Sequence, residues 1–201
     1  MKAWGRGKSV PIFPLGTVLF PGGVLPIKIF EVRYVEMAKD CLKGGTPFGV
    51  CLIREGAEVG TPAVPEPVGC LARIADCDVE ELGIIKVKAE GLERFRIVST
   101  EVNSDGLVVG RVEDLHPERE VTDAPGLIEC AQFLRKVMPG IGTERFAQPY
   151  RFDDATWVGF RLAEILPLRM DVKQKLLELT DATLRLGILH KFLQQQKLIA
   201  S

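Results

Sequence analysis

The sequence is poor in the residues that carry enzyme chemistry. It has two histidines and four serines, at His116, His190, Ser9, Ser99, Ser104 and Ser201. No serine stands in the Gly-x-Ser-x-Gly pattern that presents a hydrolase nucleophile, and a cysteine nucleophile would need a histidine as its base. A Ser-Lys dyad is conceivable where Ser99 lies on a predicted strand beside Lys86 and Lys88, but a strand serine with solvated lysines is the stronger interpretation. We predict that the protein is not an enzyme and assign no catalytic residue.

Paired cysteines and metal-ligand spacings are also missing. The five cysteines are odd in number and include no Cys-x-x-Cys pair, so neither a disulfide framework nor a four-ligand zinc site has a starting pattern. We expect them to be small buried apolar residues in a reducing cytoplasm. His116 and His190 are expected to have structural or surface roles, and we predict no metal and no cofactor. The cysteines are Cys41, Cys51, Cys70, Cys77 and Cys130.

The chain has no excess of either charge. Its net charge is -1, with 26% charged residues and no long block of one sign. This balance gives no electrostatic attraction to nucleic acid or to an anionic membrane, so neither is predicted as a partner. The stretch Ser9–Ile27 has no charged residue and superficially resembles a leader or a membrane span, but its four prolines would break a spanning helix. We predict a cytoplasmic protein.

A nucleotide site also lacks support. Gly7-Lys8-Ser9 matches the end of the phosphate-binding pattern GxxxxGKS, but Lys2 stands where the first glycine is required. Val10-Pro11 follows where a helix should begin, so no helix N-terminus would face a phosphate. We interpret the match as coincidental.

The densest structural signal is Pro11–Tyr34, PIFPLGTVLFPGGVLPIKIFEVRY. Its prolines and glycines exclude a long helix and a regular central strand, so we predict short strands and turns followed by a helix over Glu31–Lys43 that stops at Gly44-Gly45. Apolar alternation at Leu25, Ile27 and Ile29, and again at Ile85, Val87 and Ala89, indicates half-buried strands. Further strands are predicted over 47–54, 68–79, 94–102 and 107–115, with a turn at 103–106 and an exposed loop over 56–67.

Helical periodicity replaces this pattern after a polar linker at 117–125. Apolar faces recur at Leu127, Cys130, Ala131, Leu134 and Met138, and again around 158–166. Asp171 with Gln174 predicts a capping-box start, Asp181 predicts a second N-cap, and 139–150 is expected to be irregular. The overall prediction is an α+β fold, in which an N-terminal pseudo-barrel of about six β-strands with one helix (10–118) precedes a C-terminal helical bundle (126–200).

Three segments resemble the N-terminal, substrate-binding domain of Lon proteases, in the order which that domain has. They are Pro11–Tyr34, then IKVKAEGLERFRIV at Ile85–Val98, then LAEILPLRMDVKQKLLELTDATLRLG at Leu162–Gly187. Together they span roughly residues 10 to 190. The resemblance implies a six-stranded barrel-like lobe and a helical lobe that bind polypeptides and do not cleave them.

Lon proteases continue into an ATPase module and a Ser-Lys protease domain, whereas this sequence ends at Ser201. We therefore expect a stand-alone recognition domain that binds unfolded or flexible polypeptides and delivers them to a separate ATP-dependent protease. A homodimer is compatible with this role. Two alternatives stay open: an assembly subunit for one folded partner, and a cryptic hydrolase using a lone Ser or Cys.

Two local hypotheses concern Pro11–Tyr34. Glu31 begins the predicted helix, and we expect its carboxylate to pair with Arg94 inside the barrel, because buried charges need partners. The turn Phe20-Pro21-Gly22-Gly23 is either the rim of a peptide-binding groove or simply a rigid turn, and the rigid turn is the favoured interpretation. The substrate-binding residues remain unassigned.

Overall fold

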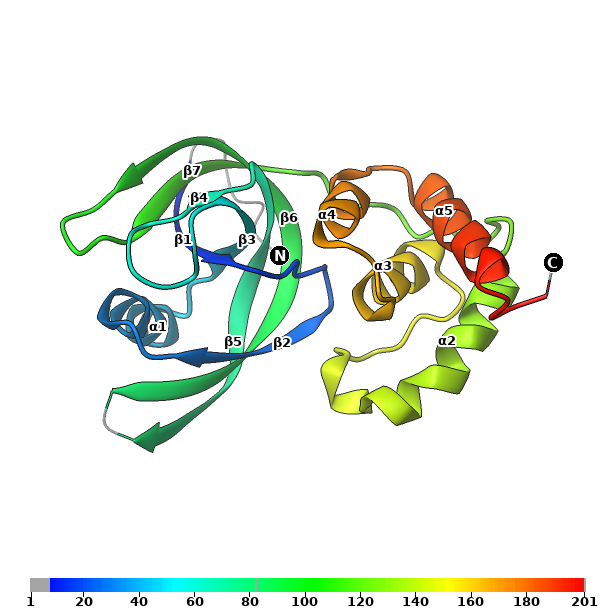
Figure 1. Ribbon diagram of the computed structural model, residues 1–201, viewed down its shortest axis with the longest axis horizontal. Helices are drawn as coiled ribbons and strands as arrows, with labels where there is room; N and C mark the ends of the chain where they lie inside the picture. The colour runs from blue at the N-terminus through cyan, green and yellow to red at the C-terminus, as the bar shows by residue number, and fades with distance from the viewer. Residues whose placement is uncertain (1–7, 82, 201) are drawn as a thin grey trace. The chain divides into compact units, whose positions relative to one another are not determined.

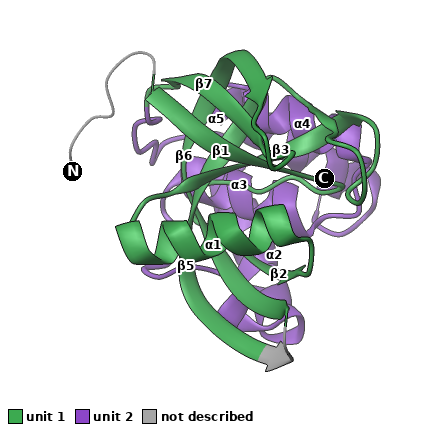
Figure 2. Ribbon diagram, turned by 90° about the vertical axis from the view of Figure 1, so that its left-hand side faces the viewer, with its two compact units in different colours: residues 1–116 green, residues 117–201 purple. Residues whose placement is uncertain are grey.

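The computed structural model describes residues 8–81 and 83–200 and divides the chain into two compact units, Met1–His116 and Pro117–Ser201. Figure 1 shows the order of the elements, and Figure 2 colours the two units separately. Strands and one helix make up the first unit, and helices make up the second. The predicted α+β class is confirmed.

The first unit contains one seven-stranded sheet within the described residues, compared with about six strands predicted. Strand β1 pairs antiparallel with β7 and parallel with β3, so the pairing β1-β7-β6-β5-β3 returns to β1. Strand β2 pairs antiparallel with β6. The strands are β1 (Lys8–Leu15), β2 (Val24–Ile29), β3 (Phe48–Glu55), β4 (Val64–Pro65), β5 (Val68–Glu81), β6 (Ile84–Val102) and β7 (Val108–Asp114).

Helix α1 (Val32–Gly44) lies against this sheet (Figure 2). The alternation predicted for β2 and β6 is confirmed, because Ile27, Ile29, Ile85, Val87 and Ala89 are buried in one apolar cluster with the helix. The helix begins after Glu31 and is capped at its C-terminal end by Gly45, which has a left-handed backbone and whose N–H donates to the carbonyl of Cys41. The predicted turn at 103–106 is also present, with the Asn103 side chain accepting from the N–H groups of Asp105 and Leu107.

Strand β6 corrects one prediction. Separate strands were expected around 85–89 and over 94–102, but residues 84–102 form one strand that pairs with β2 over its first part and with β7 over its last part. Gly91 exchanges backbone hydrogen bonds with the turn, donating to Gly23 and accepting from Gly22, both at 2.8 Å. A Cβ at Gly91 would overlap the carbonyl oxygen of Phe20. The glycine therefore permits a close backbone approach and does not end the strand.

The same contact decides between the two interpretations of the Phe20–Gly23 turn. Phe20 has no exposed surface, and the N–H of Gly23 donates to its carbonyl at 3.0 Å. A fully buried phenylalanine cannot form the rim of a groove. The segment is a rigid turn packed on β6.

The second unit contains α2 (Leu127–Ile141), a 3-10 turn η1 (Thr143–Arg145), α3 (Ala155–Ile165), α4 (Met170–Glu178) and α5 (Ala182–Gln195). Helix α3 packs against α2, α4 and α5. The apolar face predicted for α2 is buried at all five positions. The helix runs through Pro139, where an irregular connection was expected, because a proline so near the C-terminus removes one hydrogen bond from the last turn only.

The helix caps agree with the sequence in one case and differ in another. The Asp181 carboxylate accepts from the N–H of Leu184 at 3.0 Å, which confirms the predicted N-cap. The capping box at Asp171 and Gln174 is wrong. Helix α4 already begins at Met170, where Asp171 pairs with Arg169 and Gln174 donates to Glu178.

Arg185 on α5 links several parts of this unit from a fully buried position. Its Nε donates to the carbonyl of Leu176 at 3.0 Å, and its two terminal nitrogens donate to the Glu118 carboxylate. The guanidinium also stacks over the ring of Phe160 at 4.0 Å. A planar group with five donors suits this position, where a lysine would satisfy fewer acceptors.

Among the helices of the described residues, none combines the length and the apolar character that crossing a membrane requires.

Candidate functional site

The first unit has a pocket of about 290 Å³ between the end of β1, strand β2, the start of α1 and the loop after β3. Phe13 and Leu15 of β1, Leu25 and Ile27 of β2 and Tyr34 of α1 contribute most of its apolar lining. These residues come from the Pro11–Tyr34 segment, which sequence reasoning singled out without assigning binding residues to it. The structure brings them together at one open, mainly apolar cavity.

Stacked aromatic rings form a rigid wall of this pocket. The rings of Phe13 and Tyr34 are 4.1 Å apart and nearly parallel, and Phe13 also contacts Phe48. The Arg33 guanidinium lies 4.8 Å from the centre of the Tyr34 ring. Burial raises the pKa of Tyr34 more than the Arg33 charge lowers it, so its hydroxyl stays neutral at physiological pH.

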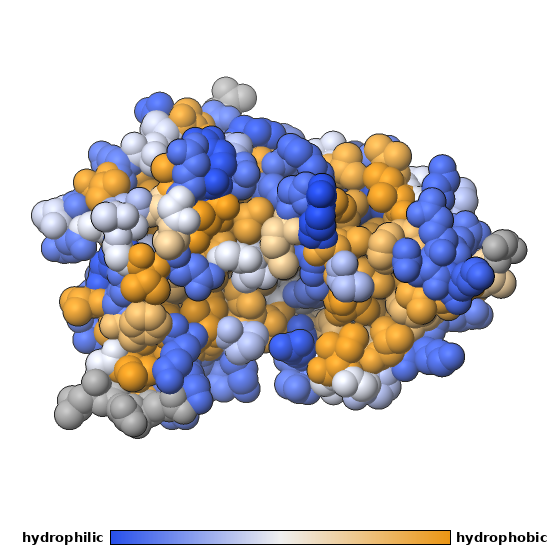
Figure 3. All heavy atoms as spheres, viewed as in Figure 1, coloured by the Kyte–Doolittle hydropathy of each residue, from blue (hydrophilic) through white to orange (hydrophobic). Residues whose placement is uncertain are grey.

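The pocket opens to solvent beside exposed apolar side chains. Phe30 is 52% exposed and Val59 is 55% exposed, and both contribute to the lining. Figure 3 shows such hydrophobic surface interspersed with polar side chains over this unit. Solvated apolar groups at the mouth of an apolar pocket are suited to contact with an apolar ligand.

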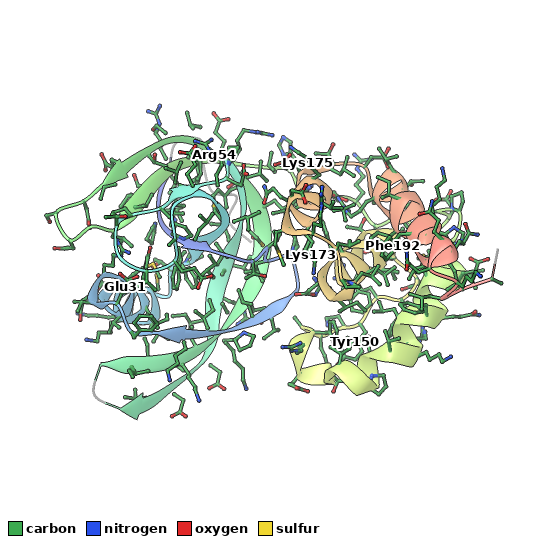
Figure 4. The ribbon with its side chains drawn as sticks, in the orientation of Figure 1. Glu31, Arg54, Tyr150, Lys173, Lys175 and Phe192 are labelled. Carbon is green, nitrogen blue, oxygen red and sulfur yellow. The ribbon has the colours of Figure 1, made fainter. Side chains whose placement is uncertain are left out.

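Glu31 pairs with Arg33 beside this mouth, so the predicted pair of Glu31 with Arg94 is wrong. One terminal nitrogen of Arg33 donates to both carboxylate oxygens of Glu31, at 2.9 and 3.1 Å, and the other donates to the carbonyl of Gly106 at 3.0 Å. Figure 4 labels Glu31 at the start of α1. Arg33 lies two residues further on in the first helical turn, so its side chain can fold back, whereas Arg94 is buried on β6.

The loop after β3 is held at the pocket by two carboxylates. The N–H of Gly16 donates to Glu58 at 2.6 Å, and the N–H of Gly60 donates to Glu31 at 3.3 Å. The loop over 56–67 is mostly exposed, as predicted, but Ala63 and Pro65 are buried at its base.

The Ser-Lys dyad considered from the sequence is not formed. Ser99, Lys86 and Lys88 lie on the same strand β6, where Ser99 is opposite Arg111 on β7. The Lys88 ammonium pairs with Asp76 at 3.1 Å. Positions so far apart along one extended strand cannot form a proton-transfer pair.

Three of the cysteines lack the features of nucleophiles. All five are free thiols; four are buried as expected, but Cys77 is exposed, which corrects that prediction for one position. Burial raises the pKa of Cys130 to about 12 and also raises the pKa of Cys41 and Cys51. A raised pKa keeps these three sulfurs as thiols, whereas the thiolate is the nucleophile.

The histidines and the N-terminal motif have structural surroundings. The ring of His190 packs over Gly126, where an added Cβ would come within 2.7 Å of it, and His116 is the last residue of its unit. Lys8 and Ser9 begin β1, where a phosphate loop would need a helix, and Gly7 lies outside the described residues. Over residues 8–81 and 83–200, no group of three or more His, Cys, Asp and Glu side chains is arranged to hold a metal ion.

A family model, the ATP-dependent protease La (LON) substrate-binding domain, matches residues 9–195. The chain belongs to this family. The resemblance identified in the sequence is thereby confirmed, and the match covers both units.

Known relatives include Lon proteases and cereblon. The Lon protease of Cytophaga hutchinsonii is 27% identical over 186 residues, which are 88% of this chain and 23% of that protein. Protein cereblon of Danio rerio is 32% identical over 120 residues, or 58% of this chain and 27% of that protein. The chain thus spans about a quarter of the length of these curated relatives.

A solved Lon N-terminal domain protein has the same fold. The crystal structure of the protein from Xanthomonas campestris is 36% identical, with a TM-score of 0.76 over 90% of this chain and 96% of that one. The N-terminal domain of a Mycobacterium avium complex Lon protease is 21% identical with a TM-score of 0.63, a likeness in fold alone.

Proposed function

We propose that this Lon substrate-binding domain is a non-catalytic module that binds unfolded polypeptides, or exposed apolar segments of them, through the pocket of its first unit. The observation that carries the proposal is the open pocket of about 290 Å³, which has an aromatic wall and the exposed Phe30 and Val59 at its mouth. Its size is at the small end of ligand sites, suited to one apolar side chain at a time.

Binding by such a pocket is reversible burial of apolar surface. Fully burying a leucine or phenylalanine side chain contributes about 1.5–3 kcal/mol, and part of that is offset by ordering the bound segment. One pocket therefore binds weakly and with little sequence preference. Such affinity suits a module that samples many unfolded chains and releases them, and a homodimer would strengthen it by presenting two pockets.

The proposed cellular role rests on the family of the chain together with this binding mode. The module would deliver bound chains to a separate ATP-dependent protease, in the cytoplasm and without a cofactor of its own. The buried thiols and the separation of Ser99 from the lysines of β6 support the absence of catalysis.

The test uses one protein as probe in two states: a native globular protein, and the same protein reduced and carboxymethylated so that it stays unfolded. We expect binding of the unfolded form only, measured by fluorescence anisotropy. Equal binding of both states would contradict the proposal, and saturable binding to one folded protein from a lysate would favour the assembly-subunit alternative. Labelling by serine- or cysteine-directed activity probes would favour the hydrolase alternative.

A matched pair of variants locates the site. Phe30→Ser removes an exposed aromatic side chain at the mouth, and Val102→Ser removes a comparably exposed apolar side chain from the end of β6. We expect about a fivefold loss of affinity for the first, from lost apolar contact area, and no change for the second. Equal effects would place binding elsewhere.

A further inference from the structure

The loop over residues 56–60, called the lid below, has the construction of a movable segment. Gly56 and Gly60 both have positive φ, +100° and +95°, and enclose Ala57, Glu58 and Val59. All five residues are exposed, so the segment buries no apolar anchor of its own. A segment without buried contacts has a low free energy of local opening.

The base of the lid is fixed. A Cβ at Gly56 would lie 3.2 Å from the Cα of buried Ala63, and β4 pairs with β3 directly beyond it. Motion is therefore confined to the tip, with the glycines as the positions that can absorb backbone rotation.

Two hydrogen bonds hold the tip against the pocket, one from each direction. The lid contributes the acceptor in the first, where Glu58 receives the N–H of Gly16. It contributes the donor in the second, where the N–H of Gly60 reaches Glu31. The ion pair with Arg33 fixes Glu31 independently of the lid, so that carboxylate stays in place as a docking point when the tip moves.

The tip also occupies the entrance. Glu58 and Val59 both line the pocket, opposite walls formed by β1, β2 and α1. We propose that residues 56–60 form a lid that partly covers the entrance of the pocket in the free protein and moves aside as one body when an apolar segment of a polypeptide enters. This inference rests on the proposed function and concerns how that site is regulated.

The lid makes a quantitative prediction about affinity. If the closed lid competes with the ligand, the apparent dissociation constant is the intrinsic one divided by the open fraction. Weakening either hydrogen bond therefore tightens binding. If residues 56–60 were instead a fixed wall of the pocket, the same substitutions would weaken binding, because they would remove contacts with the ligand.

Amide hydrogen exchange tests lid opening without any ligand. The Glu58→Ala substitution removes the acceptor of the Gly16 N–H, so the Gly16 amide exchanges faster whether or not the lid opens. The informative amide is that of Gly60, because the substitution does not remove its acceptor, Glu31. We expect exchange at Gly60 to accelerate about tenfold, because opening requires both bonds to break. Glu101→Ala, at an exposed carboxylate on β6, is the control and should leave Gly60 unchanged. An unchanged Gly60 amide in Glu58→Ala would overturn the one-body lid.

Peptide binding tests competition. The probe is a fluorescent Gly-Ser peptide with one central phenylalanine, compared with the same peptide carrying alanine. We expect Glu58→Ala to bind the phenylalanine peptide several-fold more tightly. Gly60→Ala should tighten it by about fivefold, because alanine disfavours the positive φ of the closed lid and meets no neighbouring atom within 4 Å.

Weaker binding by both variants would mean a fixed wall and overturn the lid. If the phenylalanine peptide binds no better than the alanine peptide to any form, the proposed function fails, and the exchange experiment still decides the lid.

Discussion

The two units both bury arginine, but they do so for different purposes. In the helical unit, Arg185 lies in the interior and joins α5 to the Glu118 carboxylate and to the carbonyl of Leu176 on α4. In the β-rich unit, Arg33 lies near the surface, where it fixes Glu31 beside an open pocket. Arg185 thus links elements in the interior of one unit, whereas Arg33 shapes the entrance of a cavity in the other. The comparison predicts large, global effects from substitutions in the helical unit and local, functional ones around the pocket.

Arg185→Ala tests this most severely. It removes the guanidinium that pairs with the buried Glu118 carboxylate, and we expect a loss of about 3–5 kcal/mol in the free energy of unfolding of the helical unit. Thiol labelling reports the unfolding of each unit individually. Cys130 lies on α2 of the helical unit, where burial raises its pKa to about 12, and Cys51 and Cys70 are buried in the β-rich unit. Cys130 should become reactive while Cys51 and Cys70 stay protected. Simultaneous exposure of all three would mean that the units unfold together.

Gly91→Ala is the matching change in the β-rich unit. The added methyl group would overlap the carbonyl oxygen of Phe20, so we expect a loss of about 3 kcal/mol from forced backbone displacement. Gly187→Ala on α5 is the control, because no atom lies within 4 Å of the new Cβ and alanine favours a helix by about 1 kcal/mol. Urea unfolding measures both. A loss below 1 kcal/mol for Gly91→Ala would show that the turn moves freely.

Asp181→Ala removes the N-cap of α5. We expect a loss of about 1 kcal/mol, because the N–H of Leu184 loses its acceptor. Asp171→Ala changes a similar residue in the first turn of α4, where the carboxylate pairs with exposed Arg169 and caps nothing. The free energy of unfolding should fall by less than about 0.5 kcal/mol in Asp171→Ala. Equal losses in chemical denaturation would restore the capping box rejected above.

The smallest effect on stability is expected at the mouth of the pocket. Phe30→Ser changes a side chain that is already half in water, so the free energy of unfolding should shift by no more than about 0.5 kcal/mol. Peptide affinity should nevertheless fall. Thermal unfolding and binding measured on one sample check both, and a large loss of stability would assign Phe30 to the core.

Local patterns predicted local structure well. Alternation located the buried residues of β2 and of the first part of β6, and helical spacing located the buried face of α2. Asp181 marked its helix start because capping depends on a few neighbouring residues. These features need no knowledge of distant contacts.

Features that depend on tertiary contacts were missed. The strands around 85–89 and over 94–102 were predicted separately, because the sequence does not show that Gly91 continues the strand while the Phe20–Gly23 turn packs on it. Glu31 was assigned to Arg94, although Arg33 was nearer, because burial of either arginine is not visible in the pattern. The pocket could not be assembled from the sequence, since its lining is drawn from residues between Phe13 and Val59 that only the fold brings together. The concentration of apolar residues in Pro11–Tyr34 was interpreted as a signal of the fold, although it also contains most of the pocket lining.

The pairing of β1 with both β3 and β7 also has a consequence for biosynthesis. Val10 is opposite Gly110, so the first strand of the β-rich unit needs a partner about one hundred residues further along the chain. At about 5–20 residues per second, a ribosome delivers that partner roughly 5–20 seconds later. Meanwhile β1 can pair with β3 alone, and the backbone N–H and C=O groups along its other edge have no strand to pair with. In the helical unit the Arg185–Glu118 pair joins residues 67 positions apart, so completing the sheet of the β-rich unit requires segments more distant in the chain than that pair does.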